Sequence, residues 1–162
     1  MRHTISVTFQ HTFNTLSRIA GLFSGRGYRI DSISLGQAEE QGLSRMTLTT
    51  RGDEQIIEQI TKQLNKLVNV IKVVDLTYEP FVERELALIK ISAPQSARME
   101  IMQIVNIFRA KIIDISPKSM TVEITGNEDK IDASIGMFKP FGISELARTG
   151  SVALRREFQG QT

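Results

Sequence analysis

Two kinds of hydrophobic spacing follow one another along residues 1–78, and their order constrains the fold more than any other feature. Some segments alternate apolar and polar residues, which is typical of half-buried strands, and others place apolar residues three and four apart, which is typical of one helix face. In chain order they are a strand (4–9), a helix (16–23), a strand (29–37), a strand (43–50), a helix beginning at Asp53 and a strand (71–78). This order predicts a ferredoxin-like βαββαβ unit, an antiparallel sheet with both helices on one face.

The same order of segments begins again after Glu79-Pro80. The expected elements are a strand (86–92), a helix (99–108), a strand (111–116), a strand (120–125), a helix (129–138) and a short strand (143–147). Residues 148–162 show no clear pattern and are left unassigned. We therefore predict an α+β chain of two ferredoxin-like halves, one domain over 1–78 and a second over 82–162.

The two halves also share residues, which indicates an internal duplication. Leu16, Ile19, Ala20, Leu22 and Phe23 match Ile101, Ile104, Val105, Ile107 and Phe108 at a constant offset of 85. Ile30-Asp31 of the next strand matches Ile113-Asp114. Met46-Thr47 precedes Gly52 as Met120-Thr121 precedes Gly126.

Composition excludes several classes of protein. The net charge of the 162 residues is only +2, and no basic stripe of the kind that binds nucleic acids is present. The strands expected at the centre of the first sheet offer one Phe and many Thr, which argues against the stacking of RNA bases. The absence of cysteine excludes disulfides and thiolate chemistry. No segment is apolar for long enough to span a bilayer, and no targeting peptide is visible, so we expect a cytoplasmic protein.

Catalytic motifs are missing, and the junction between the first strand and the first helix is the remaining candidate site. His3 and His11 lack metal-ligand spacing, and no phosphate-binding or nucleophile motif is present. Asn14 and Asp53 are predicted to be the N-caps of the two helices of the first half, and Gly25 and Gly27 to end the first of them. The free amides of a helix N-terminus can bind a carboxylate, so residues 11–15 are either such a site or merely a capped turn.

Several short motifs of the sequence resemble those of one protein family. In the first half they are Leu16-Ser17-Arg18-Ile19-Ala20-Gly21-Leu22-Phe23, Arg26-Gly27-Tyr28, Ile30-Asp31-Ser32 and Leu43-Ser44-Arg45-Met46-Thr47. In the second half they are Val82-Glu83-Arg84-Glu85-Leu86, Ile107-Phe108-Arg109-Ala110 and Ala147-Arg148-Thr149-Gly150. The match extends over almost the whole chain, which resembles the small regulatory subunit of acetohydroxyacid synthase, also called acetolactate synthase.

The resemblance implies an N-terminal ACT domain that binds effectors and dimerises, followed by an ACT-like domain. It implies a non-catalytic regulatory subunit that activates a separate catalytic subunit in branched-chain amino acid biosynthesis. That partner would hold thiamine diphosphate, Mg²⁺ and FAD and condense pyruvate with pyruvate or 2-oxobutyrate, whereas this chain would hold no cofactor or metal. Branched-chain amino acids (chiefly valine, with leucine and isoleucine) would bind between the ACT domains of a homodimer.

The resemblance places one wall of the effector pocket at the loop before the first helix, and the other wall at the second strand and its approach from the neighbouring chain of the dimer. The residues there are His11, Thr12, Phe13, Asn14, Thr15, Leu16, Arg29 and Ile30. The family usually has Asn-x-x-Gly where this chain has His11 and Asn14, and tends to have Asn where it has Arg29. We expect either weak or absent valine feedback with activation retained, or a more acidic effector attracted by Arg29. The alternative for the whole chain is a stand-alone, amino-acid-responsive ACT regulator.

Overall fold

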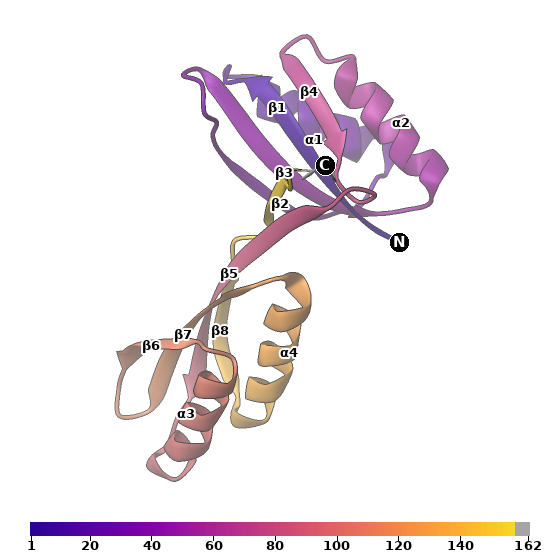
Figure 1. Ribbon diagram of the computed structural model, residues 1–162. Coiled ribbons are helices and arrows are strands. Elements are labelled where there is room, and N and C mark those ends of the chain that lie inside the picture. Colours follow the sequence, from indigo (N-terminus) through magenta and orange to yellow (C-terminus); the bar gives the residue numbers. More distant parts are fainter. Residues whose placement is uncertain (158–162) are drawn as a thin grey trace, which may run out of the picture. The chain divides into compact units, whose positions relative to one another are not determined.

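The computed structural model describes residues 1–157, which form two compact units (Figure 1). The first unit contains Met1–Val82 together with residues 151–157, and the second contains Glu83–Gly150. Residues 158–162, which end the unassigned segment of the sequence, lie outside the described residues. No helix in the described part of the chain is long and apolar enough to cross a membrane.

The first unit has the predicted βαββαβ order. Its elements are β1 (Arg2–Gln10), α1 (Thr15–Arg26), β2 (Ile30–Gln37), β3 (Leu43–Arg51), α2 (Glu54–Asn65) and β4 (Val70–Asp75). The strands form an antiparallel sheet in the order β2-β3-β1-β4, so β2 and β4 are its edges. Both helices cover one face of this sheet (Figure 1). The ferredoxin-like prediction is confirmed for this unit.

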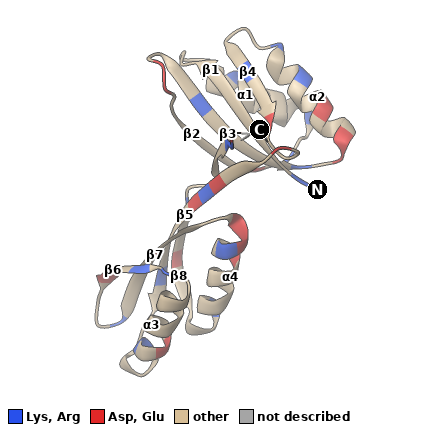
Figure 2. Ribbon diagram, in the orientation of Figure 1, with Lys and Arg blue, Asp and Glu red and all other residues tan. Residues whose placement is uncertain are grey.

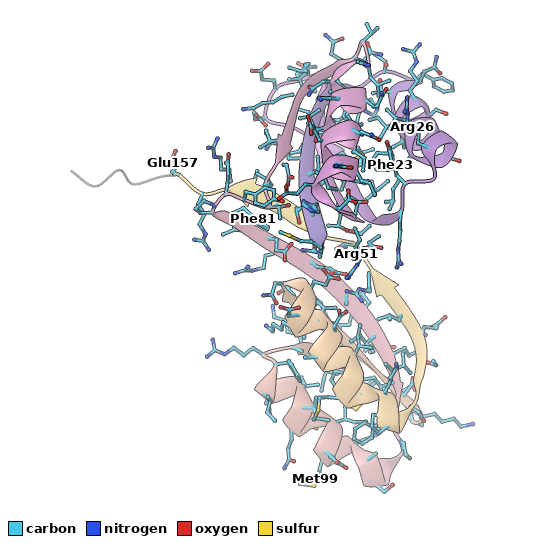
Figure 3. The ribbon with its side chains drawn as sticks, turned by 90° about the vertical axis from the view of Figure 1, so that its right-hand side faces the viewer. Phe23, Arg26, Arg51, Phe81, Met99 and Glu157 are labelled. Carbon is cyan, nitrogen blue, oxygen red and sulfur yellow. The ribbon has the colours of Figure 1, made fainter. Side chains whose placement is uncertain are left out.

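Apolar side chains at helical and strand spacing meet in one core between the helices and the sheet. Its fully buried members are Ile5, Val7, Phe9, Ile19, Phe23, Met46, Leu48, Ile60 and Leu64. Phe23, labelled in Figure 3, is 1% exposed. Gly27 ends α1 in the left-handed region, with φ of 67°, where a residue without Cβ is favoured. Removing each large apolar side chain from water stabilises the fold by about 1.5–3 kcal/mol.

The second unit repeats the architecture. Its elements are β5 (Phe81–Ser92), α3 (Arg98–Ile107), β6 (Lys111–Ile115), β7 (Ser119–Gly126), α4 (Glu128–Phe138) and β8 (Ile143–Arg148), with short 3₁₀ turns before α3 and after α4. Its sheet order is β6-β7-β5-β8. A separate core includes Ile89, Ile101, Val122 and Phe138.

The two sheets share irregularities as well as order, which strengthens the case for internal duplication. Asp31 is skipped in the pairing of β2 with β3, and Ile113 is skipped in the pairing of β6 with β7. The register also shifts after Thr8 in β1 and after Lys90 in β5. The bulges therefore align Asp31 with Ile113, one residue away from the Ile30-Asp31 and Ile113-Asp114 match made on the sequence.

The C-terminal residues differ from the expected second domain over 82–162. A further strand, β9 (Val152–Arg155), pairs with β5 and contacts β1 and β3. Ser151 and Ala153 are buried, and Arg2 Nη2 donates a hydrogen bond to Ser151 Oγ at 3.2 Å. The buried positions carry small side chains whereas Val152 and Leu154 are exposed, so the hydrophobic pattern did not reveal this strand.

Candidate effector-binding site

The loop between β1 and α1 begins with His11, which is held against the β2–β3 hairpin. The backbone amide of His11 donates to the carbonyl of Gly42 at 2.9 Å, and His11 Nδ1 lies 3.0 Å from Ser44 Oγ. Ser44 is buried in β3. The His11 imidazole is therefore positioned by the hairpin.

Two threonines organise the rest of the loop. Thr12 Oγ1 and Thr15 Oγ1 are hydrogen-bonded at 2.6 Å, and Thr15 Oγ1 also donates to the carbonyl of Gln10 at 3.2 Å. Asn69 Nδ2 donates to Thr12 Oγ1 at 3.0 Å from the loop before β4. Because Thr15 is only 1% exposed, the two bonds of its hydroxyl are partly shielded from water, and together the three bonds fix the path of the chain into α1.

The prediction that the Asn14 side chain caps α1 is wrong, although Asn14 does occupy the N-cap position. Its φ of −102° and ψ of −6° are helical, and its side chain makes no capping hydrogen bond. A capping side chain normally requires extended backbone, as at Asp53, where φ is −82° and ψ is 172°. Asp53 Oδ1 accepts from the amide of Ile56 at 2.9 Å, as predicted for the second helix. The Asn14 side chain is thus exposed beside an uncapped first turn.

The loop also presents apolar side chains to solvent. Phe13 is fully exposed and Leu16 is 43% exposed. Of the predicted pocket residues in this loop, only Thr15 is buried. The loop is therefore a surface feature of the single chain, with ordered polar groups beneath exposed apolar ones.

Arg29 and Ile30 lie at the start of β2, where a small ionic cluster forms. Arg29 Nε and Arg51 Nε contact the two carboxylate oxygens of Asp31 at 2.7 and 2.9 Å. Arg51 is labelled in Figure 3. The carbonyl of Arg29 accepts from Thr50 Oγ1, and Ile30 packs against the core. Two guanidinium groups therefore face the single carboxylate of Asp31 at this end of β2.

A single chain does not bring the two parts of the predicted pocket together. Ile30 is opposite Thr50 at one end of β3, whereas Gln10, which precedes the loop, is opposite Leu43 at the other end. A strand rises about 3.3 Å per residue, so the length of β2 separates the two parts by roughly 23 Å. The resemblance implied that these two groups come from two different chains of a dimer, and within one chain they lie at opposite ends of the sheet.

A hollow that the sequence analysis missed lies beside His11. Its volume is about 380 Å³. It is lined by His11, Leu35, Gly36, Gln37, Gly42, Leu43 and Ser44. The hairpin that ends β2 and begins β3 supplies most of this lining. Among residues 1–157, no group of three or more His, Asp or Glu side chains could hold a metal ion.

Comparison with known proteins gives a consistent result for both units. Residues 5–72 match the profile of the AHAS small subunit-like ACT domain, and residues 84–157 match that of the small subunit of acetolactate synthase. The chain is 52% identical to the acetolactate synthase small subunit of Aquifex aeolicus over 157 residues, which cover 96% of this chain and 82% of that protein.

Two further relatives agree with these matches. A probable acetolactate synthase small subunit of Methanothermobacter thermautotrophicus is 51% identical over 95% of this chain and 92% of its own length. The crystal structure of the acetolactate synthase small subunit from Thermotoga maritima superposes with a TM-score of 0.89 at 41% identity, covering 98% of this chain and 99% of that one.

Proposed function

The chain belongs to the family of acetolactate synthase small subunits, and we propose that it activates the thiamine-diphosphate-dependent catalytic subunit of that enzyme. It is a regulatory, non-catalytic subunit of the enzyme complex. The observation that carries the proposal is the 52% identity to an acetolactate synthase small subunit over nearly the whole chain. In this proposal the catalytic partner holds thiamine diphosphate, Mg²⁺ and FAD and makes acetolactate from pyruvate.

Affinity capture tests the partnership directly. Tagged full-length chain is expressed together with the acetolactate synthase catalytic subunit of the same genome, and the proposal predicts that the two elute together in a fixed ratio. Elution of the tagged chain without that subunit would contradict the proposal and favour a stand-alone regulator.

We further propose that an amino-acid effector binds between two copies of the first unit, at the β1–α1 loop of one copy and the start of β2 of the other. The support is geometric. Within the described residues β2 is an edge of the sheet, and an edge strand is a ready template for another chain. If two copies of β2 pair antiparallel about a two-fold axis, Ile30 of one copy lies opposite Gln37 of the other.

That pairing would unite the two groups that the single chain keeps apart. Gln37 lines the hollow beside His11, so the second copy's Arg29 would approach the same hollow. The uncapped amides at the start of α1 suit the carboxylate of an amino acid. The hollow of about 380 Å³ is large enough for a branched-chain side chain.

The proposed site departs from the family pattern in ways that reduce affinity for valine. Asn14 places a side chain where a glycine would let the effector approach the backbone. The His11 imidazole is bonded to Ser44 and stands at the wall of the hollow. The second copy's Arg29 adds a cation that favours a more acidic effector than valine, although Asp31 already shares it.

Calorimetric titration of the full chain with valine, leucine and isoleucine tests this part. We expect weak or undetectable valine binding, and tight valine binding would contradict the assigned effect of these residues. The triple variant His11→Asn, Asn14→Gly, Arg29→Asn is expected to bind valine.

Dividing the triple change between two chains tests whether the site is shared. One chain carries His11→Asn with Asn14→Gly, and the other carries Arg29→Asn. In a mixed dimer one site then combines all three changes and should bind valine, whereas neither parent homodimer should. Absence of valine binding by the mixed dimer, when the triple variant binds, would show that the site lies within one chain.

A further inference from the structure

A groove runs between α2 and β4, the edge strand on the far side of the sheet from β2. Its volume is about 410 Å³. The buried side chain of Ile57 and the ring of Tyr78 supply apolar lining, and three carboxylates, Glu54, Glu58 and Asp75, surround them. The groove thus combines an apolar surface with an acidic border.

Most of this negative charge is not balanced within the groove. Lys62 Nζ pairs with Glu58 at 2.7 Å. In the described part of the chain, no lysine or arginine forms an ion pair with Glu54 or Asp75. Figure 2 shows acidic positions along α2. One lysine therefore faces three carboxylates.

A buried histidine behind the groove gives a second, independent indication. His3 is 1% exposed and its Nδ1 makes no hydrogen bond, although it points at Asp75 Oδ2 from 3.4 Å. The other oxygen of Asp75 accepts from the amide of Thr77 at 3.0 Å. The Asp75 carboxylate is thus held in place at the wall of the groove, and the His3 Nδ1 atom beside it lacks a hydrogen bond.

Tyr78 offers an aromatic face at the same place. Tyr78 is 60% exposed, and its ring stands edge-on to the His3 ring with centroids 5.9 Å apart. Desolvation raises the pKa of the Tyr78 phenol, and the negative charges of Glu54 and Asp75 raise this pKa further. The phenol of Tyr78 therefore lies in the negative potential of Glu54 and Asp75, and this potential would also attract a cation bound in the groove.

We propose that this groove binds an arginine side chain from an extended segment of a partner polypeptide. The guanidinium would meet the carboxylates of Glu54 and Asp75 and the face of Tyr78, while its alkyl stem would lie against Ile57. Arginine suits such a site because its planar, weakly hydrated cation both pairs with carboxylates and stacks on aromatic rings.

The edge strand favours a polypeptide over a free small cation. Within the described residues β4 pairs on one side only, with β1, and Ile71 and Lys72 of β4 are exposed. An extended segment could hydrogen-bond to the outer side of β4 and place alternate side chains in the groove. This surface is separate from the β2 edge of the proposed effector site.

Amide NMR of the isotope-labelled full chain provides the test. The probe is a blocked Val-Arg-Val tripeptide, the matched neutral control is the same peptide with citrulline in place of arginine, and free agmatine is the small-cation control. We expect saturable shifts at Ile57, Thr61 and Asp75 with the arginine peptide, and at least about tenfold weaker binding of the citrulline peptide. Agmatine should bind more weakly than the arginine peptide, because it cannot pair with β4.

Charge variants make the result specific. Two substitutions, Glu54→Gln and Asp75→Asn, should each weaken binding of the arginine peptide about threefold or more. Glu54 is exposed, so its substitution does not put folding at risk. The control Glu100→Gln on α3 should leave binding of the peptide unchanged. Equal binding of the arginine and citrulline peptides would overturn the proposal, as would unchanged binding by Glu54→Gln or no shift at these amides. Agmatine as tight as the peptide would show a small-cation site and overturn the polypeptide assignment.

Discussion

Replacement of Thr15 by valine tests whether the threonine cluster fixes the β1–α1 loop. Valine keeps the shape of threonine, so the core packing is preserved and only the hydroxyl is lost. That hydroxyl is buried, bonds to Thr12 Oγ1 at 2.6 Å and to the carbonyl of Gln10 at 3.2 Å, and lies 3.4 Å from Asn69 Nδ2. A net hydrogen bond contributes about 1 kcal/mol, and a buried acceptor left without its donor costs more. We therefore expect a loss of about 2 kcal/mol in the free energy of unfolding of the first unit.

The chain supplies its own probe for this measurement. It has no tryptophan, and both of its tyrosines, Tyr28 and Tyr78, lie in the first unit, so tyrosine fluorescence in a urea titration reports that unit. The matched control is Thr61→Val, because Thr61 Oγ1 donates only to the carbonyl of Ile57 within α2, at 2.9 Å. This control should change the free energy by less than about 0.5 kcal/mol. Equal effects of the two substitutions would refute the argument that the loop depends on the threonine cluster.

Three further predictions concern the other charged and apolar contacts. Glu85→Gln removes the carboxylate that contacts Arg148 Nε at 2.6 Å and Nη2 at 3.2 Å. Because the Glu85 side chain is 4% exposed, this substitution should destabilise the second unit by about 3 kcal/mol, as measured by far-UV circular dichroism in a urea titration. Phe138→Ala should cost that unit about 3–5 kcal/mol in the same titration and leave the tyrosine fluorescence transition unchanged. Glu54→Gln should lower the pKa of Tyr78 toward its ordinary value in an absorbance titration, because a negative charge beside the phenol is removed while its desolvation remains.

The sequence predicted the parts of the fold that depend on periodicity. Strand and helix spacing gave the order of both units, and the Asp53 cap and the Gly27 helix end followed from local chemistry. The last strand of the first unit was expected over 71–78, but β4 ends at Asp75. Beyond it, the amide of Leu76 still donates one hydrogen bond to the carbonyl of Thr4, at 2.9 Å.

The site was harder to predict than the fold, because it depends on tertiary neighbours. Residue preference predicted a capping role for Asn14, whereas the Thr12–Thr15 bond, to which Asn69 of a distant loop adds a further bond, fixes the helix entry. The resemblance assigned the loop and Arg29 to neighbouring chains, and the strand register adds that one chain holds them at opposite ends of its sheet.

The measurement that most directly tests the central claim is acetolactate formation by the catalytic subunit of the same genome, titrated with this chain. The account predicts that the rate rises with added chain and saturates at a fixed molar ratio, while the chain alone makes no acetolactate from pyruvate. A rate that stays unchanged through a molar excess of the folded chain would contradict the activating role.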